Sequence, residues 1–186
     1  MAKAKKPEPL FKTPEDQLGK VELIKRDANM ARGTLHDDFR DLSDDSVENA
    51  SEQVAKSHGI YLEYNRAKTG KEKDWMYMIR VSVPGGGSFN REQWAMLDEL
   101  SEKYTVNPEG APSLRVTTRQ NIQFHWVKKR HVVDIVQGIA KTGFFTLNGC
   151  GDNARNVMGC PLSKFSTIYD ANAKAHQFGE YFRLPA

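Results

Sequence analysis

The segment WMYMIRVSV, at residues 75–83, constrains the fold more than any other part of this sequence. Its odd-numbered positions carry Trp, Tyr, Ile, Val and Val, whereas its even-numbered positions carry Met, Met, Arg and Ser. A period of two is typical of a strand that buries one side, because successive side chains point to opposite faces of a sheet. The glycines of PGGG, at residues 84–87, end the strand. The sequence therefore predicts a sheet with one covered face and one open face.

The elements that follow this strand predict two helices that cover the sheet. Apolar stripes at helical spacing run over residues 88–104, capped by the serine at the start, and over residues 131–142. Short apolar strands are expected at 114–118, 122–127 and 144–147. The order β-α-β-β-α-β is that of a ferredoxin-like sandwich, an α+β fold with helices on one face of an antiparallel sheet.

The chain divides into three predicted regions. Residues 1–64 are an N-terminal arm with one helix, 65–147 are the ferredoxin-like half-domain, and 148–186 are the start of a second α/β domain. Within the arm, apolar residues at helical spacing predict a helix in residues 37–56, which Gly59 ends.

Composition excludes some classes of protein. The chain has 186 residues, with 27 lysines and arginines against 24 aspartates and glutamates. No apolar run reaches the length of about 18 residues that a membrane span needs, and the basic start has no apolar core behind it, so a cytoplasmic location is expected. Cys150 and Cys160 fit neither a disulfide framework nor a zinc or iron–sulfur ligand pattern, and both are predicted to be free.

The open face of the predicted sheet gathers polar and cationic side chains. A three-residue loop at RQN pairs Val116 with Phe124, and it places Phe124 and Trp126 beneath the helices. The opposite face then holds Arg80, Arg115, Thr117, Gln123 and His125, with Arg119 at the hairpin tip. Guanidinium groups bind carboxylates bidentately, so this face suits a planar ligand with carboxylates around its edge. The alternative is an ordinary solvated sheet face, in which His125 is a structural residue rather than a proton donor or metal ligand.

A second cationic feature lies in LNGCGDNARNVMGCPLS, at residues 147–163. Its glycines permit tight turns, and Asp152 is expected to cap a helix that begins at Asn153 and carries Arg155 on its first turn. Helix starts of this kind bind anions through their free N–H groups. An ordinary entry from a loop into a helix explains the same residues equally well.

Three ordered strings, IRVSVPGGG (79–87), LRVTTRQNIQFHW (114–126) and GCGDNARNVMGCP (149–161), resemble the sirohaem-containing nitrite and sulfite reductases. The resemblance covers roughly residues 57–186 and implies an N-terminal portion of such an enzyme. It also implies a sirohaem and a [4Fe–4S] cluster in the complete enzyme, six-electron reduction of sulfite or nitrite, and electrons from ferredoxin or a flavoprotein. The histidine after QF and the GCGD loop favour sulfite over nitrite.

The resemblance assigns roles to particular residues. Arg80 and Arg155 resemble the arginines that hold the oxyanion over the haem, so they are the expected substrate-binding and catalytic residues. The expected cofactor-binding residues are Arg115, Thr117, Arg119, Gln123, His125, Asn153 and Asn156. No residue of this chain is expected to ligate a metal, because the cluster cysteines of the family are expected to fall beyond its last residue.

This departure from the family pattern leaves other functions open. By itself the chain is expected to be inactive, either as a non-catalytic fragment or as a scaffold for a partner chain that supplies the cluster. A basic open sheet is also typical of RNA-recognition motifs, which stack bases on aromatic side chains of that face. The pattern places the nearby aromatic residues on the helix side, namely Trp75, Tyr77, Phe124 and Trp126. Nucleic-acid binding is therefore the less favoured alternative.

Overall fold

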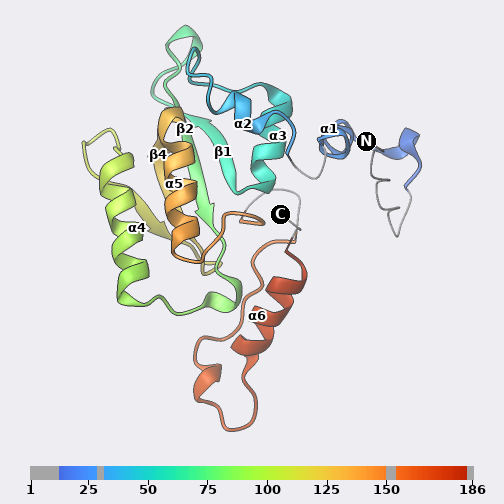
Figure 1. The fold of residues 1–186 in the computed structure, drawn as a ribbon, viewed down its shortest axis with the longest axis vertical. Helices are drawn as coiled ribbons and strands as arrows, with labels where there is room; N and C mark the ends of the chain where they lie inside the picture. Colours follow the sequence, from blue (N-terminus) through green and yellow to red (C-terminus); the bar gives the residue numbers. More distant parts are fainter. Residues whose placement is uncertain (1–12, 29–31, 150–153, 184–186) are drawn as a thin grey trace, which may run out of the picture.

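A four-stranded antiparallel sheet forms the centre of the protein, and two helices cover one of its faces (Figure 1). The computed structural model describes residues 13–28, 32–149 and 154–183. The strands lie in the order β1-β2-β4-β3. Their bounds are β1 (Ile60–Tyr64), β2 (Trp75–Val81), β3 (Leu114–Val116) and β4 (Ile122–Val127). The predicted α+β class and the ferredoxin-like layering are both confirmed.

The two covering helices lie close to their predicted positions. Helix α4 spans Arg91–Tyr104, and Asn90 caps it instead of the serine two residues earlier. The Asn90 side chain accepts from the backbone N–H of Gln93 at 2.8 Å, and the side-chain oxygen of Gln93 accepts from the backbone N–H of Asn90 at 3.0 Å. This reciprocal pair satisfies two backbone donors that a serine further out leaves unpaired. Helix α5 spans Lys129–Lys141, and Gly143 follows it in the left-handed region.

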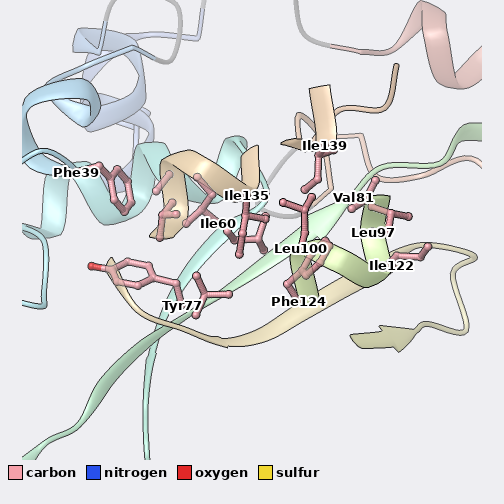
Figure 2. Packing of buried hydrophobic residues seen from close by; sticks show 14 of the residues in the cluster. Phe39, Ile60, Tyr77, Val81, Leu97, Leu100, Ile122, Phe124, Ile135 and Ile139 are labelled. Atoms are coloured by element: carbon pink, nitrogen blue, oxygen red, sulfur yellow. The ribbon is translucent and has the colours of Figure 1, made fainter. Parts of the chain in front are cut away.

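The core lies between this helix pair and the covered face of the sheet (Figure 2). Its largest fully buried side chains include Tyr77, Ile79 and Phe124 from the strands and Leu97 and Ile135 from the helices. Burial of one such side chain stabilises the fold by roughly 1.5–3 kcal/mol. Along β2 the predicted core residues Tyr77, Ile79 and Val81 are buried, but Met76 and Met78 on the opposite side are buried as well, so burial does not alternate strictly.

The sequence predicts the fourth strand at residues 144–147, and this prediction is wrong. That segment forms only an isolated bridge between Phe145 and Ser82. Strand β1 occupies the edge of β2 instead, with Ile60 opposite Ile79. The carbonyl of Gly59 accepts from the backbone N–H of Arg80 at 2.8 Å, so β1 and the residue before it take most of the available edge.

The hairpin between β3 and β4 is offset from the predicted register by two residues. Leu114 lies opposite Phe124 and Val116 opposite Ile122, so the turn is five residues long. The backbone N–H of Thr117 donates to the carbonyl of Asn121 at 2.8 Å and closes the turn. The predicted pairing is therefore wrong, but residues 114–116 and 122–124 keep their predicted faces, because an even shift leaves a side chain on its own side of the sheet.

A β-bulge in β4 overturns the predicted position of Trp126. Tyr77 pairs with Val127 whereas Ile79 pairs with Phe124, so β4 carries one extra residue between these pairs. Trp126 takes the left-handed backbone conformation, with φ of 59°. The bulge buries Val127 in the core and moves Trp126 to the lining of a cavity on the open face.

The remaining helices are α1 (Lys20–Asp27), α2 (Leu35–Asp38), α3 (Asn49–Ser57) and α6 (Ala171–Tyr181). Helix α3 packs on β1, α1 and α2 pack on α3, and in Figure 1 α6 lies beyond one end of the sheet. The helix expected within residues 37–56 is the shorter α3, because aspartates before it close side-chain turns: Asp44 accepts from the backbone N–H of Ser46 at 2.8 Å. The prediction of a helix that begins at Asn153 is wrong for the residues that the structure describes, because residues 154–160 are not helical. Across the parts of the chain that the structure describes, no helix has the length and apolar character to span a bilayer.

Candidate functional site

The candidate site is the open face, by which we mean the side of the sheet opposite α4 and α5. Residue pairing defines its members, because cross-strand partners share a face. Glu63 lies opposite Met76, and Arg80 lies opposite Gln123, which also pairs with Arg115. The open face thus contains Tyr61, Glu63, Met76, Met78, Arg80, Arg115, Gln123 and His125, joined by Trp126 at the bulge.

Two glycines hold the backbone around Arg80. A Cβ atom on Gly149 would lie 2.6 Å from the carbonyl oxygen of Arg80, and one on Gly59 would lie 2.8 Å from the same oxygen. The Arg80 guanidinium in turn donates through Nη1 to the carbonyl of Gly149 at 3.2 Å. The backbone at Gly149 therefore packs directly on the strand and fixes the direction of the Arg80 side chain.

Gln123 connects Arg80 to His125. With its amide oxygen toward Arg80, Gln123 accepts from Arg80 Nε at 2.8 Å and from Nη2, and its amide nitrogen donates to Nε2 of His125 at 3.3 Å. This arrangement requires His125 Nε2 to be an acceptor, which only the neutral imidazole provides. Burial, aided by the charges of Arg115 and Arg80, lowers the pKa of His125 to about 4. His125 is therefore an uncharged hydrogen-bonding group at neutral pH.

A cavity of about 520 Å³ lies beside these residues, toward β1. Met76 and Trp126 give it an apolar part, and Arg115, Arg66 and His125 give it a polar part. Apolar surface with a few convergent polar groups is typical of small-molecule sites. A flat ligand with carboxylates at its edge matches this combination, because its ring contacts the apolar side chains and its carboxylates meet the guanidinium groups.

Several predicted site residues lie elsewhere, at the tip of the β3–β4 hairpin. The hydroxyl of Thr117 accepts from the backbone N–H of Asn121 at 3.1 Å, so Thr117 closes the turn. The side chain of Asn156 is buried and donates to the carbonyl of Arg119 at 2.8 Å, which ties the C-terminal segment to the hairpin. Arg119 and Arg155 are exposed, and neither lines the cavity described above.

The structure thus brings together only part of the predicted set. Arg80, Arg115, Gln123 and His125 share the open face, as the alternation predicts. Asn153 lies outside the described residues. The roles assigned to all of these residues remain predictions, since shared position on a face is not contact with a ligand.

The PGGG segment does more than end a strand, which is all that the sequence pattern predicts for it. The backbone N–H of Gly85 donates to the carbonyl of Val157 at 2.9 Å. A Cβ atom on Gly85 would lie 2.9 Å from the carbonyl of Asn172, and one on Gly86 would lie 2.3 Å from the side chain of Gln120. Three successive glycines exceed what a strand end needs, and this excess is the sequence signal for such close packing.

Glu63 and Trp126 are cavity residues that the sequence pattern does not find. Glu63 comes from β1, a strand that was not predicted, and Trp126 comes from the unpredicted bulge. Burial raises the pKa of the Glu63 carboxyl, against the opposing effect of the nearby arginines Arg66, Arg115 and Arg80.

Metal ligation finds no support in the residues that the structure describes. Within them, no three histidine, cysteine, aspartate or glutamate side chains come together as a metal site. Cys160 is exposed and free, as predicted, whereas Cys150 lies outside the described residues. The described residues therefore do not fit an iron–sulfur cluster, which needs several thiolates.

Comparisons with known proteins agree with this fold. A family model described as the nitrite/sulfite reductase ferredoxin-like half domain matches residues 69–142. The chain is 34% identical over 161 residues to the sulfite reductase [NADPH] hemoprotein beta-component of Bordetella petrii. It is 37% identical over 166 residues to the protein of the same name from Anoxybacillus flavithermus. Residues 69–142 therefore belong to the ferredoxin-like half-domain family of nitrite and sulfite reductases.

The similarity extends over most of this chain but only part of each relative. The two alignments cover 83% and 86% of the chain, but 26% and 28% of the respective relatives. The solved structure of the Mycobacterium tuberculosis NirA protein has the same fold, with a TM-score of 0.64 and 23% identity. That match covers 78% of this chain and 28% of NirA. The chain thus spans about a quarter of the length of these curated bacterial relatives.

Proposed function

We propose that the open face binds the edge of a carboxylate-bearing tetrapyrrole of the sirohaem type, and that the chain serves sulfite reduction as an N-terminal part of a hemoprotein. One observation carries the proposal: Arg80, Arg115 and neutral His125 share the one sheet face that α4 and α5 leave uncovered. The names of the relatives, sulfite reductase hemoproteins, favour sulfite over nitrite as the substrate.

The side chains of the open face have complementary roles in this proposal. Arg115 pairs with a carboxylate of the tetrapyrrole, for which its exposed guanidinium is free to form a bidentate contact. His125 stays uncharged and offers one ring nitrogen as a hydrogen-bonding group, while Gln123 holds the other. Arg119, Thr117 and Asn156 would contribute from the hairpin tip and the segment that packs on it, and Asn153 is proposed to bind the same ligand.

Arg80 and Arg155 are the proposed oxyanion-binding residues. The Gly149 carbonyl and the Gln123 amide hold the guanidinium of Arg80, so that its position is set before a ligand arrives. A fixed cation stabilises negative charge on sulfite oxygens and supports their protonation as they leave as water. When bound in the complete enzyme, the sirohaem and its [4Fe–4S] cluster supply the redox chemistry, with electrons from ferredoxin or a flavoprotein.

Direct binding of a polycarboxylate porphyrin tests the proposal. Uroporphyrin, which carries eight carboxylates, is titrated into the full 186-residue chain while tryptophan fluorescence and porphyrin absorbance are followed. We expect weak but saturable binding, and we expect Arg115→Ala to weaken it several-fold. The matched control is Arg91→Ala, which removes an exposed arginine at the start of α4, on the covered side of the sheet. Equal affinities for the two variants, or no binding by the wild type, would contradict the proposal.

A second candidate function, a scaffold for a partner polypeptide, is favoured by the surface of the C-terminal segment. Large apolar side chains there are exposed, namely Leu162, Phe165, Ile168, Tyr169, Phe178, Tyr181 and Phe182. The exposed fraction of Ile168 reaches 93%, and exposed apolar side chains that gather in one patch mark protein contacts. Co-expression with the C-terminal three quarters of the Bordetella petrii hemoprotein tests this candidate by co-elution on gel filtration. A combined Phe165→Ser and Ile168→Ser variant is expected to lose co-elution, and equal co-elution would refute the contact.

A further inference from the structure

Glu63 places a carboxyl group among the cations of the open face. It lies on β1 opposite Met76, and it lines the same cavity as Arg66, Arg115 and His125. Within the described part of the chain, no arginine closes an ion pair with Glu63, although three of them influence it electrostatically. The cavity therefore holds an acidic group that is neither neutralised by a direct partner nor fully hydrated.

We propose that Glu63 selects the charge of the ligand that the open face accepts, by opposing an anionic ligand while ionised and admitting it most tightly once protonated. This inference rests on the proposed function, since it concerns the same carboxylate-bearing ligand. The effect of Glu63 is large because few charged side chains line the cavity. Arg66 and Arg115 contribute two positive charges, and Glu63 contributes one negative charge. Protonation of this single carboxyl changes the formal charge of the lining from +1 to +2.

Glu63 is the one carboxyl group among the described residues that line this cavity. Arg80 on β2, Arg115 on β3 and Arg66 after β1 remain charged at all working pH values. His125 on β4 remains neutral above its pKa of about 4. Helix α3 packs on β1 and brings Lys56 and Glu52, but these two pair with each other at 3.0 Å.

The direction of the pH effect follows from linkage. A ligand carboxylate near Glu63 disfavours the ionised carboxyl, so the pKa of Glu63 is higher in the complex than in the free protein. Binding therefore takes up a proton between these two pKa values. Burial already raises the pKa of Glu63 in the free protein, which moves this window toward neutral pH. Affinity should rise as the pH falls through the window and should level off below it.

The test measures uroporphyrin binding to the full chain from about pH 5.5 to 8.5, a range in which ligand carboxylates stay largely ionised. The variants are Glu63→Gln, which keeps the shape without the charge, and Glu63→Met, which resembles its cross-strand partner and serves if the first variant folds poorly. The control is Glu102→Gln, which removes an exposed charge from α4 on the covered side. Calorimetry in two buffers of different ionisation heat counts the protons taken up on binding.

The inference predicts that Glu63→Gln binds on the order of tenfold more tightly at the upper end of this range, which corresponds to about 1.4 kcal/mol. It also predicts that Glu63→Gln loses the pH dependence and the proton uptake, while Glu102→Gln retains both. Identical pH profiles and proton counts for wild type and both Glu63 variants would overturn the inference and leave the proposed function standing. Absence of porphyrin binding by every protein would overturn the proposed function, and the inference with it.

Discussion

Replacement of Gly59 by alanine is expected to destabilise the protein through the contact that holds Arg80. Gly59 has a φ of +73°, and its Cβ atom would lie 2.3 Å from the carbonyl oxygen of Thr146 and 2.8 Å from that of Arg80. Both neighbours are backbone atoms, so neither moves without displacing β2 or the 146–149 loop. The left-handed conformation alone costs an alanine about 1–2 kcal/mol.

The backbone clash adds to this conformational cost. Overpacking of a close contact typically costs about 1–3 kcal/mol, so the free energy of unfolding should fall by roughly 2–5 kcal/mol in total. Gly70→Ala separates the two contributions, because Gly70 has a φ of +66° but no atom within 4 Å of its Cβ position. The control variant should therefore lose only the conformational part, about 1–2 kcal/mol.

Urea denaturation followed by circular dichroism measures both variants. The difference between their free energies of unfolding should be at least about 1 kcal/mol, with equal slopes against urea. Gly59→Ala should also weaken uroporphyrin binding, because displacement of the Arg80 backbone moves a proposed ligand-binding side chain, whereas Gly70→Ala should bind normally. Equal destabilisation by the two alanines would refute the idea that close packing at Gly59 positions Arg80.

Three further expectations concern the core and the open face. Phe124→Ser should lower the free energy of unfolding by about 3–5 kcal/mol in a urea titration, because the ring is fully buried. An unchanged free energy of unfolding would mean that the two sheet faces have been assigned the wrong way round. By NMR, His125 should titrate near pH 4, below its ordinary value of about 6.5. Stability should fall as the pH drops from about 6.5 toward 4, because the unfolded state binds the proton first, and His125→Gln should flatten that part of the profile. In a complete enzyme, Arg80→Ala should reduce sulfite turnover without unfolding the protein, and loss of folding with normal turnover per folded molecule would contradict its assigned role.

The sequence predicts the sheet faces well because alternation is a local property. The period of two along β2 places Arg80 opposite to the core residues, and the structure agrees. Even the wrong hairpin register keeps Arg115 and Gln123 on the open face, because the error is two residues. Face assignment is therefore more robust to errors of register than pairing is.

The errors arise where long-range packing decides the outcome. The bulge at Trp126 ends the alternation of IQFHW, and the partners on β2 require the extra residue. Strand β1 is five residues long and has aromatic or apolar residues on both faces, so its alternation is weak. The role of the PGGG glycines depends on Val157 and Asn172, which are distant in sequence.

These errors change the chemistry assigned to the open face. The predicted face is cationic, with His125 as a possible additional charge, whereas the structure keeps His125 neutral and adds Glu63 from the unpredicted strand. A face with arginines alone would bind any compact anion, and its charge would not respond to pH in the neutral range. With Glu63 in the cavity, every anionic ligand meets one opposing charge beside the arginines, so the affinity for a carboxylate ligand depends on whether Glu63 is ionised. The choice of ligand then depends on a carboxyl group at the edge of the sheet as much as on the guanidinium groups at its centre.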